Sequence, residues 1–393
     1  MKQPRTALRD LASPNGLVGG PFGSSLISAD YVEGGVPVIR GGNMTFGPWL
    51  AGDFAFVSAE KYARDLTRNT AVPGDLVFTQ RGTLGQVAVV PDGGYEKYVV
   101  SQSQMRLRID PKMAHARYVY YACSSPDFQA QVRDHAISTG VPHINLGILG
   151  SLTIPSFPIK RQRAIAEVLE ALDDKIAANA RLMRTCDDFA QFLTRRSFGQ
   201  HRCRLGEIAE LTMGSSPPGA SYNEERRGVI FYQGVRDFGV RHPRKRVWTS
   251  SPVRVAQEGD VLISVRAPVG RVNVASEPAC IGRGLAAARS TQSRPHLLYH
   301  VLRAAGSVWA PFEAEGTVFG SINQTQLTGL LLPLVPEHLA PALEARLSAF
   351  DACISSALGE NDVLTRTRDE LLPLLMSGKV RVKDAERVVE EVV

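Results

Sequence analysis

Short apolar runs separated by turn residues dominate two long parts of the chain, residues 1–158 and 200–336. Runs such as residues 76–78 and 261–263 are rich in β-branched or aromatic side chains and are bounded by Gly, Pro, Asp or Asn. This pattern is typical of β-strands joined by tight turns. Each part also contains one stretch with helical spacing, at residues 117–133 and 295–310. The pattern therefore predicts two mixed domains that are rich in β-structure.

A different pattern follows each of these parts, with apolar residues at intervals of three, four and seven. Such heptad spacing is typical of a coiled-coil seam. The first seam is Ile165, Leu169, Leu172, Ile176, Met183, Cys186 and Leu193, and it skips Asn179 and Ala190. The second seam is Leu343, Leu347, Phe350, Ile354, Ala357, Leu364 and Leu371, and its polar interruptions are Asn361 and Arg368.

Two equivalent seams in one chain can bury each other. We predict that they pair as antiparallel helices, each roughly 50 Å long at about 1.5 Å per residue. An Asn in such a seam lowers stability but fixes the register of the pair. The alternative is that each helix packs separately on its own domain.

The chain also contains an internal repeat of domain size. Residues 73–87 return 185 residues later as residues 258–272, and Ile144 and Asn145 return as Ile322 and Asn323. A repeat of this length is too long for a solenoid unit and has the size of a whole domain. We predict an α+β fold in which two similar β-rich domains are joined by two long antiparallel spacer helices. The predicted segments are a first domain at 1–158, a first spacer helix at 159–199, a second domain at 200–336, a second spacer helix at 337–382 and a C-terminal tail at 383–393.

Composition indicates a globular protein with a basic surface. Hydrophobic residues make up 44% of the chain and charged residues 21%, and the net charge is +6. Residues 200–336 carry 16 Lys and Arg against 10 Asp and Glu. A basic surface attracts polyanions such as nucleic acids. The five cysteines form no CxxC pair, and neither a signal peptide nor an apolar run of membrane-spanning length is apparent, so we expect a cytoplasmic protein without a zinc site.

Several motifs together resemble the specificity (S) subunit of Type I restriction–modification systems. The order of these motifs and their duplication carry the resemblance, which covers essentially the whole chain. One departure is Glu337 to Ala340, where the usual Glu-Gln pair at the start of the spacer helix is missing; Arg161 replaces that Glu in the first half. The matching segments are Gly20–Leu26 with Tyr31 and residues 36–43, Gly74–Leu76 with residues 81–85, residues 154–176, and residues 375–382.

The resemblance implies a division of labour. Each domain would read one half of a bipartite site in double-stranded DNA, and the helices would space the domains and bind two modification (methyltransferase) subunits. Those subunits would bring S-adenosylmethionine, and a restriction subunit that uses ATP and Mg²⁺ can join. The chain itself would hold no cofactor, no metal and no catalytic residue.

Two other classes of function remain open at this point: a self-contained DNA-modifying enzyme and a coiled-coil scaffold that binds proteins. A methyltransferase loop would need an aromatic residue after Ser216, Pro217 and Pro218, but Gly219 follows. Gly378 and Lys379 are followed by Val380, so a P-loop is not formed. These observations disfavour the enzyme, and the basic charge of the domains disfavours the scaffold.

The candidate DNA contacts lie in polar loops that follow apolar strands. Arg and Gln side chains there could read guanine or adenine edges, and glycines let the backbone approach phosphates. The alternative for Arg81 and Arg266 is structural pairing with Asp75 and Asp260. Together with Arg241, the basic run 244–246 is a candidate phosphate clamp. The predicted contacts are Arg40, Asn43, Arg81, Thr83, Gln86, Gln233, Arg236, Arg244, Lys245, Arg266 and Arg271.

Overall fold

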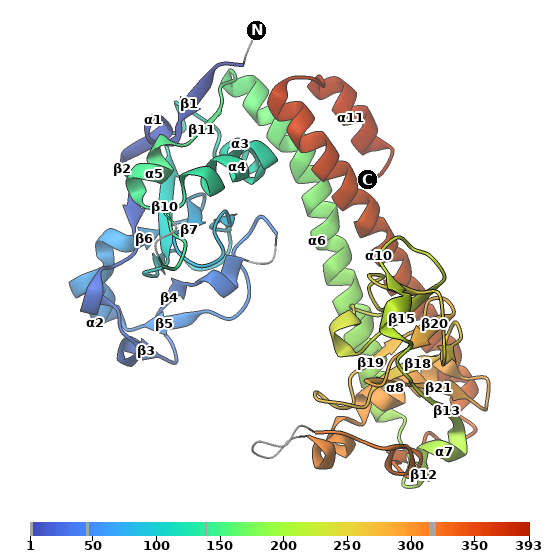
Figure 1. The fold of residues 1–393 in the computed structure, drawn as a ribbon. Helices are drawn as coiled ribbons and strands as arrows, with labels where there is room; N and C mark the ends of the chain where they lie inside the picture. Colours follow the sequence, from blue (N-terminus) through green and yellow to red (C-terminus); the bar gives the residue numbers. More distant parts are fainter. Residues whose placement is uncertain (1–2, 45–46, 138–139, 314–319) are drawn as a thin grey trace. The chain divides into compact units, whose positions relative to one another are not determined.

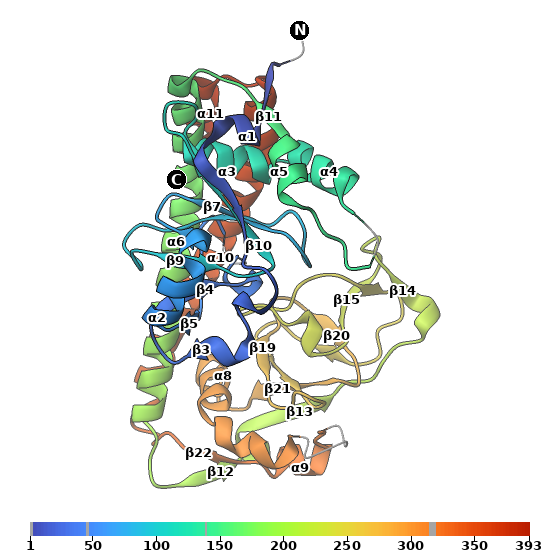
Figure 2. The ribbon, with the colours of Figure 1, turned by 90° about the vertical axis from the view of Figure 1, so that its left-hand side faces the viewer.

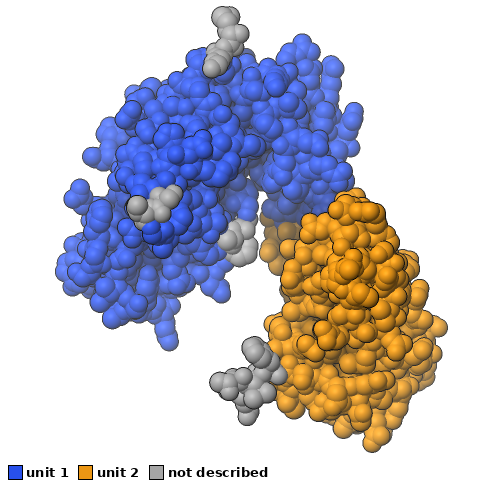
Figure 3. Space-filling view, viewed as in Figure 1, with its two compact units in different colours: residues 1–178, 361–393 blue, residues 179–360 orange. Residues whose placement is uncertain are grey.

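The computed structural model describes residues 3–44, 47–137, 140–313 and 320–393 (Figure 1). The chain divides into two compact units (Figure 3). Unit 1 consists of Met1–Ala178 and Asn361–Val393, and unit 2 consists of Asn179–Glu360. Each unit therefore contains one β-rich domain and a part of each long helix.

The domain of unit 1 has three sheets and short helices. The four-stranded sheet has the order β2-β10-β7-β8, the five-stranded sheet has the order β3-β5-β4-β9-β6, and β1 pairs with β11. The strands are β1 (Arg5–Ala7), β2 (Ala12–Gly19), β3 (Tyr31–Val32), β4 (Val36–Ile39), β5 (Ala55–Val57), β6 (Thr70–Ala71), β7 (Leu76–Thr79), β8 (Val87–Val89), β9 (Tyr98–Val100), β10 (Gln104–Ile109) and β11 (Thr153–Pro155). The helices are α1 (Leu8–Leu11), α2 (Ala59–Lys61), α3 (Ala116–Ser124), α4 (Pro126–His135) and α5 (Leu146–Ser151).

The domain of unit 2 repeats this topology strand for strand. Its sheets have the orders β13-β21-β18-β19 and β14-β16-β15-β20-β17, and β12 pairs with β22. The strands are β12 (Arg202–Arg204), β13 (Ala209–Met213), β14 (Tyr222–Asn223), β15 (Val229–Tyr232), β16 (Trp248–Thr249), β17 (Val255–Ala256), β18 (Val261–Ser264), β19 (Val272–Val274), β20 (Ala279–Ile281), β21 (Leu285–Ser290) and β22 (Leu331–Pro333). The helices are α7 (Leu205–Ile208), α8 (Pro295–Ala304) and α9 (Gln324–Thr328).

The four-stranded sheet of each domain is buried on both faces, which explains why its strands read as continuous apolar runs. In unit 1, Leu76 and Phe78 of β7 pack into the core that contains α3, whereas Val77 between them packs against the five-stranded sheet. Side chains alternate between the two faces of a strand, so one strand serves both cores. In unit 2, Ile263 and Leu262 of β18 divide between the two cores in the same way.

The two long helices are α6 (Ile159–Arg196) and α10 (Ala340–Ser377). In unit 1, the N-terminal half of α6 and the C-terminal half of α10 share one core, and the two helices lie side by side in Figures 1 and 2. In unit 2, the C-terminal half of α6 packs with the N-terminal half of α10. The pairing is therefore antiparallel within each unit, and the predicted α+β architecture of two β-rich domains with long antiparallel helices is confirmed.

Most predicted seam residues lie inside these shared cores. The fully buried members include Leu169, Leu172 and Leu347, while Ile176 and Phe350 are partly exposed. The other buried seam residues are Ile165, Cys186, Leu343, Ile354, Ala357, Leu364 and Leu371. The polar interruption Arg368 is neutralised, because its guanidinium lies 2.7 Å from a carboxylate oxygen of Asp173 on α6.

Buried carboxylates at matching places on the two helices hold each domain to its helices. In unit 1, the Tyr121 hydroxyl donates to Asp173 at 2.7 Å. In unit 2, Asp351 lies 2.9 Å from Nε2 of His300 and 2.7 Å from Nδ1 of His296. Burial alone would raise the pKa of Asp351, but the two histidine hydrogen bonds lower it below its usual value. The domains are thus fixed to the helices by hydrogen bonds as well as by apolar contact.

Two local predictions were wrong. The single helix predicted over residues 117–133 is two helices, α3 and α4, because Ser125 caps α4 and Pro126 occupies its first turn. The predicted tail at 383–393 is mostly a helix, α11 (Val382–Glu390), and it buries Ala385 and Val389. No helix among the described residues is both long enough and apolar enough to span a membrane.

Candidate nucleic-acid interface

Three loops of the first domain meet at one edge of its sheets. They follow β4, β7 and β9 and begin at Arg40, Gln80 and Ser101. The Ser101 amide donates to Ile39 O at 3.1 Å, and the Gln80 amide donates to the carbonyl of Ser103 at 2.7 Å. Because β4 and β9 are parallel neighbours, their carboxyl ends lie at the same edge. The three loops are therefore bonded into one surface.

The second domain builds the same surface with the same backbone hydrogen bonds. The Gly282 amide donates to Tyr232 O at 2.9 Å, and the Val265 amide donates to the carbonyl of Gly284 at 2.9 Å. These bonds join the loops that follow β15, β18 and β20. A Cβ at Gly284 would lie 2.7 Å from the carbonyl oxygen of Gln233, so only glycine allows these loops to approach so closely. We call each set of three bonded loops a loop surface.

One arginine occupies the same place on each loop surface. Arg81 and Arg266 are both exposed, and each forms an isolated β-bridge, with His143 and Ser321 respectively. Within the described part of the chain, neither guanidinium forms an ion pair. Each loop surface therefore presents a free cation from a fixed backbone position.

The carboxylates considered as partners of these arginines bind elsewhere. The Asp75 carboxylate accepts hydrogen bonds from two guanidinium nitrogens of Arg108, each at 2.8 Å. The Asp260 carboxylate accepts two hydrogen bonds from the Arg289 guanidinium in the same bidentate way, at 2.8 and 2.9 Å. The structural alternative for Arg81 and Arg266 is therefore wrong, and both side chains are available to a ligand.

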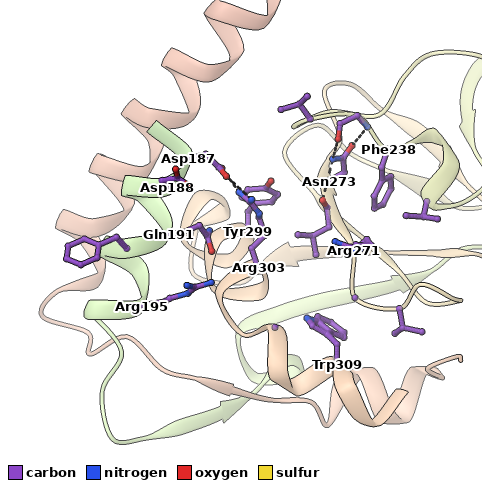
Figure 4. Close-up of a pocket in the computed structure, with 18 of the residues that line it drawn as sticks. Asp187, Asp188, Gln191, Arg195, Phe238, Arg271, Asn273, Tyr299, Arg303 and Trp309 are labelled. Atoms are coloured by element: carbon purple, nitrogen blue, oxygen red, sulfur yellow. Dashed lines mark hydrogen bonds and ion pairs between the residues drawn. The ribbon is translucent and has the colours of Figure 1, made fainter. Parts of the chain in front are cut away.

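An open groove of about 1130 Å³ adjoins the loop surface of unit 2 (Figure 4). One wall is α6, with Asp187 and Arg195, and the other carries Arg271 of the loop between β18 and β19. Arg303 of α8 binds Asp187 at 2.8 Å through its second nitrogen, which neutralises that carboxylate. Arg195 and Arg271 are exposed. The groove is also lined by Arg196, Asp188 and Glu313, so four arginines face three carboxylates in its lining.

Comparison with known proteins agrees with this duplicated architecture. A family model of the Type I restriction modification DNA specificity domain matches residues 23–184. The specificity subunit of the type I restriction enzyme MjaX of Methanocaldococcus jannaschii is 27% identical over 350 residues, which cover 81% of each chain. The chain is therefore similar to Type I restriction–modification specificity subunits over most of its length. The MjaVIII specificity subunit of the same organism is 19% identical over 332 residues, covering 74% of this chain and 76% of that protein.

The fold of this chain is also found in a solved structure. The S subunit of a Type I restriction–modification system from M. genitalium has a TM-score of 0.63 and 17% identity, and the likeness covers 95% of this chain and 96% of that one. At this identity the likeness establishes the fold alone. It supports the arrangement of two β-rich domains and two long helices.

Most of the predicted DNA contacts are exposed. Gln86 is half-buried and its side-chain oxygen accepts a hydrogen bond from Thr79 at 3.1 Å, so it is partly engaged. Gln233 is also half-buried. Lys245 lies 2.5 Å from a carboxylate oxygen of Glu277, although both side chains remain accessible. The exposed members are Arg40, Arg81, Thr83, Arg236, Arg244, Lys245, Arg266 and Arg271.

Asn43 does not fit the predicted contact role. Only 2% of it is exposed, and its amide nitrogen donates to Ala51 O and Asp53 O at 3.2 and 3.1 Å. Its side-chain oxygen accepts from the Arg40 amide at 2.9 Å. Asn43 therefore holds the loop that carries Arg40, and its polar atoms do not face a ligand.

Arg241 does not belong to a phosphate clamp. It is 2% exposed, and its guanidinium lies 3.0 Å from Asp351 and 3.2 Å from Asp187. Arg246 lies 3.1 Å from the buried Asp237. Arg244, Lys245 and Arg246 of the predicted clamp are exposed, but Lys245 and Arg246 are paired with Glu277 and Asp237. A run of basic residues in the sequence does not show which side chains are solvated and which, like Arg241, bind a carboxylate that is 54 residues away in the sequence.

The sequence interpretation missed Arg283 on the second loop surface. Gly282 and Gly284 both pack against Gln233, and the Val265 amide donates to the carbonyl of Gly284. Arg283 between them is exposed, and its Nε donates to the Ser216 hydroxyl at 3.4 Å. Its alignment with Gln102, which follows β9 in the first domain, was the signal that could have identified it.

Proposed function

We propose that this chain is the DNA sequence-recognition subunit of a Type I restriction–modification complex, and that each domain reads one half of a bipartite site. The observation that carries the proposal is the loop surface, which occurs twice with the same backbone bonds and a free arginine at the same place. Two domains with the same backbone geometry but different exposed side chains could bind DNA in the same way and recognise different base sequences. Phosphate contacts would position each domain and base contacts would specify its half-site.

The proposed partners follow from the similarity to Type I specificity subunits. Two modification subunits would dock on the helices, and S-adenosylmethionine, ATP and Mg²⁺ would be bound by partner subunits. Exposed apolar side chains on the unit 2 part of α6 support docking there: Leu182, Phe189 and Phe192 are 45%, 51% and 53% exposed. Such a patch on a soluble surface is typical of a protein contact. A cytoplasmic location is part of the proposal, because the DNA and the partner subunits are found there.

A methyl-transfer assay separates this function from that of a self-contained enzyme. The purified chain is incubated with labelled S-adenosylmethionine and duplex DNA, with and without its modification subunit. We expect label transfer only when both proteins are present, and only at adenines of a two-part motif. Label transfer by the chain alone would refute the proposal, as would a modification subunit that methylates the same motif without it.

A further inference from the structure

Two thiols meet across the helix pair of unit 2. Cys186 lies on α6 and Cys353 lies on α10, and their sulfur atoms are 3.8 Å apart. Cys186 is 8% exposed, whereas Cys353 is half-buried. The other three cysteines, Cys123, Cys203 and Cys280, are buried and free. Only this pair, among the described residues, brings two sulfurs together.

Helix pairing explains this contact. Cys186 is a member of the predicted seam of α6, and Cys353 directly precedes Ile354, a buried member of the seam of α10. The antiparallel pairing therefore fixes both backbones around the thiols. A disulfide has its sulfurs about 2 Å apart, so closure requires a movement of about 2 Å between the two sulfurs. Rotation about the side-chain bonds of a cysteine supplies movements of this size without displacing a helix.

We propose that Cys186 and Cys353 form a dithiol modification site that closes into an interhelix disulfide when the protein meets a small-molecule disulfide such as oxidised glutathione. This site is separate from the loop surfaces and does not depend on DNA recognition. It would make the helix pair of unit 2 sensitive to oxidation.

The reaction is a pair of thiol–disulfide exchanges. The thiolate of Cys353, the more accessible thiol, attacks one sulfur of the oxidant, whose disulfide bond breaks and releases one small thiol. The thiolate of Cys186 then attacks the Cys353 sulfur and expels the second small thiol. The two cysteines lose two protons and two electrons in total, and the small-molecule disulfide is reduced to two thiols.

Burial assigns the order of the two steps. Burial raises the pKa of the Cys186 thiol, so less of it is ionised, and the oxidant also has poor access to it. Cys186 therefore suits the second, intramolecular step, in which its neighbour is already in contact. The disulfide would join two residues that are 167 positions apart in the sequence. Because it restricts the unfolded chain, it would lower the equilibrium constant for unfolding of unit 2 by on the order of 10³-fold.

Peptide mapping of the full-length protein tests the proposal. The reduced protein is incubated with oxidised glutathione, free thiols are blocked with N-ethylmaleimide under denaturing conditions, and the digest is analysed by mass spectrometry. We expect a cross-linked Cys186–Cys353 peptide about 2 Da lighter than the sum of its parts, with the other cysteines blocked. A lasting glutathione adduct on Cys353, blocked thiols at both positions, or cross-links that favour another cysteine would overturn the proposal.

Matched variants distinguish this pair from general oxidation. Cys203→Ser removes another buried cysteine of unit 2 and should leave the cross-link intact, whereas Cys353→Ser should abolish it. Oxidised wild type should unfold at a higher urea concentration than reduced wild type, and a reductant should reverse the shift. Circular dichroism of Cys353→Ser verifies that it is folded. A folded Cys353→Ser variant that shows the same oxidation-dependent shift would contradict the assignment. Neither result bears on the proposed DNA recognition, which the methyl-transfer assay tests separately with reduced protein.

Discussion

At the scale of single residues, the free arginines of the two loop surfaces are the most direct candidates for contact with DNA. Arg81 and Arg266 hold matching positions, and Asp75 and Asp260 are occupied by other arginines. A guanidinium that is exposed, unpaired and fixed at its backbone can bond bidentately to a guanine edge. These two residues should therefore act independently, one in each half-site.

We predict that Arg81→Ala and Arg266→Ala each weaken specific DNA binding by about 1–3 kcal/mol, which is about 5- to 150-fold. The loss should be accompanied by relaxed sequence preference in one half-site only. Titration of the assembled complex with DNA variants in each half-site measures both effects. Arg202→Ala is the matched control, because Arg202 is exposed on β12 and not on a loop surface. Unchanged affinity and preference in both loop variants would exclude them as contacts.

The sequence predicted which arginines could matter, but it did not predict which of them are free. Arg81 and Arg266 were recognised because the repeat places them in equivalent loops. Arg241 and Asn43 were misjudged because their partners come from other segments, and a one-dimensional pattern does not show those segments meeting. Arg283 was missed because its role depends on a loop packing against Gln233. Three-dimensional neighbours decide whether a polar side chain serves the fold or a ligand.

At the scale of elements, the helices were the most predictable part of the molecule. The heptad pattern persists over several turns, and α6 and α10 bury most of the residues that the pattern selects. Short elements were less predictable, because three or four residues carry little periodicity. Helix α11 is a different case: it has nine residues, and Val382, Ala385 and Val389 recur at helical spacing, so the sequence did carry a pattern that predicts it.

The docking of the second domain on α10 predicts a particular dependence of stability on pH. Burial lowers the pKa of His300, so its contribution to stability is present above the unfolded value of about 6.5 and is lost as the pH falls. The hydrogen bond to Asp351 raises the pKa of His296, so its contribution is present below about 6.5 and is lost as the pH rises through the higher folded value. The two contributions oppose each other in the wild type.

His296→Gln should therefore make the free energy of unfolding fall more steeply than in the wild type as the pH is lowered from about 7 to about 5. His300→Gln should shift the slope in the opposite direction. Urea denaturation followed by circular dichroism at several pH values measures both slopes. Identical pH slopes in the two variants would contradict the assigned protonation states.

A second prediction at this scale concerns the length of the spacer helices. In the proposed function they set the distance between the half-sites, and one heptad adds about 10 Å to a helix, or about three base pairs of DNA. Insertion of seven residues near Ala180 should change the unspecified gap of the methylated motif and preserve both half-sites. Methylome sequencing of cells that carry the variant with its modification subunit reads the gap directly. An active variant with an unchanged gap would exclude the helices as the ruler.

At the scale of the whole molecule, the chain is a duplication in which corresponding sheets have the same strand order. The parts that repeat most faithfully are the backbone bonds of the loop surfaces and the Asp–Arg pairs at the opposite ends of β7 and β18. The parts that differ are the side chains on those surfaces, such as Gln102 and Arg283. A constant scaffold with different exposed side chains is what two independent readings of DNA require.

Domain exchange tests this central claim most directly. Residues 1–158 are replaced by the equivalent domain of a specificity subunit with a different known target, and the methylome of cells expressing the hybrid with its modification subunit is sequenced. The proposed function predicts that one half-site changes to that of the donor, while the other half-site and the gap stay the same. A hybrid that methylates a motif changed in both half-sites, or one whose motif is unchanged, would contradict it.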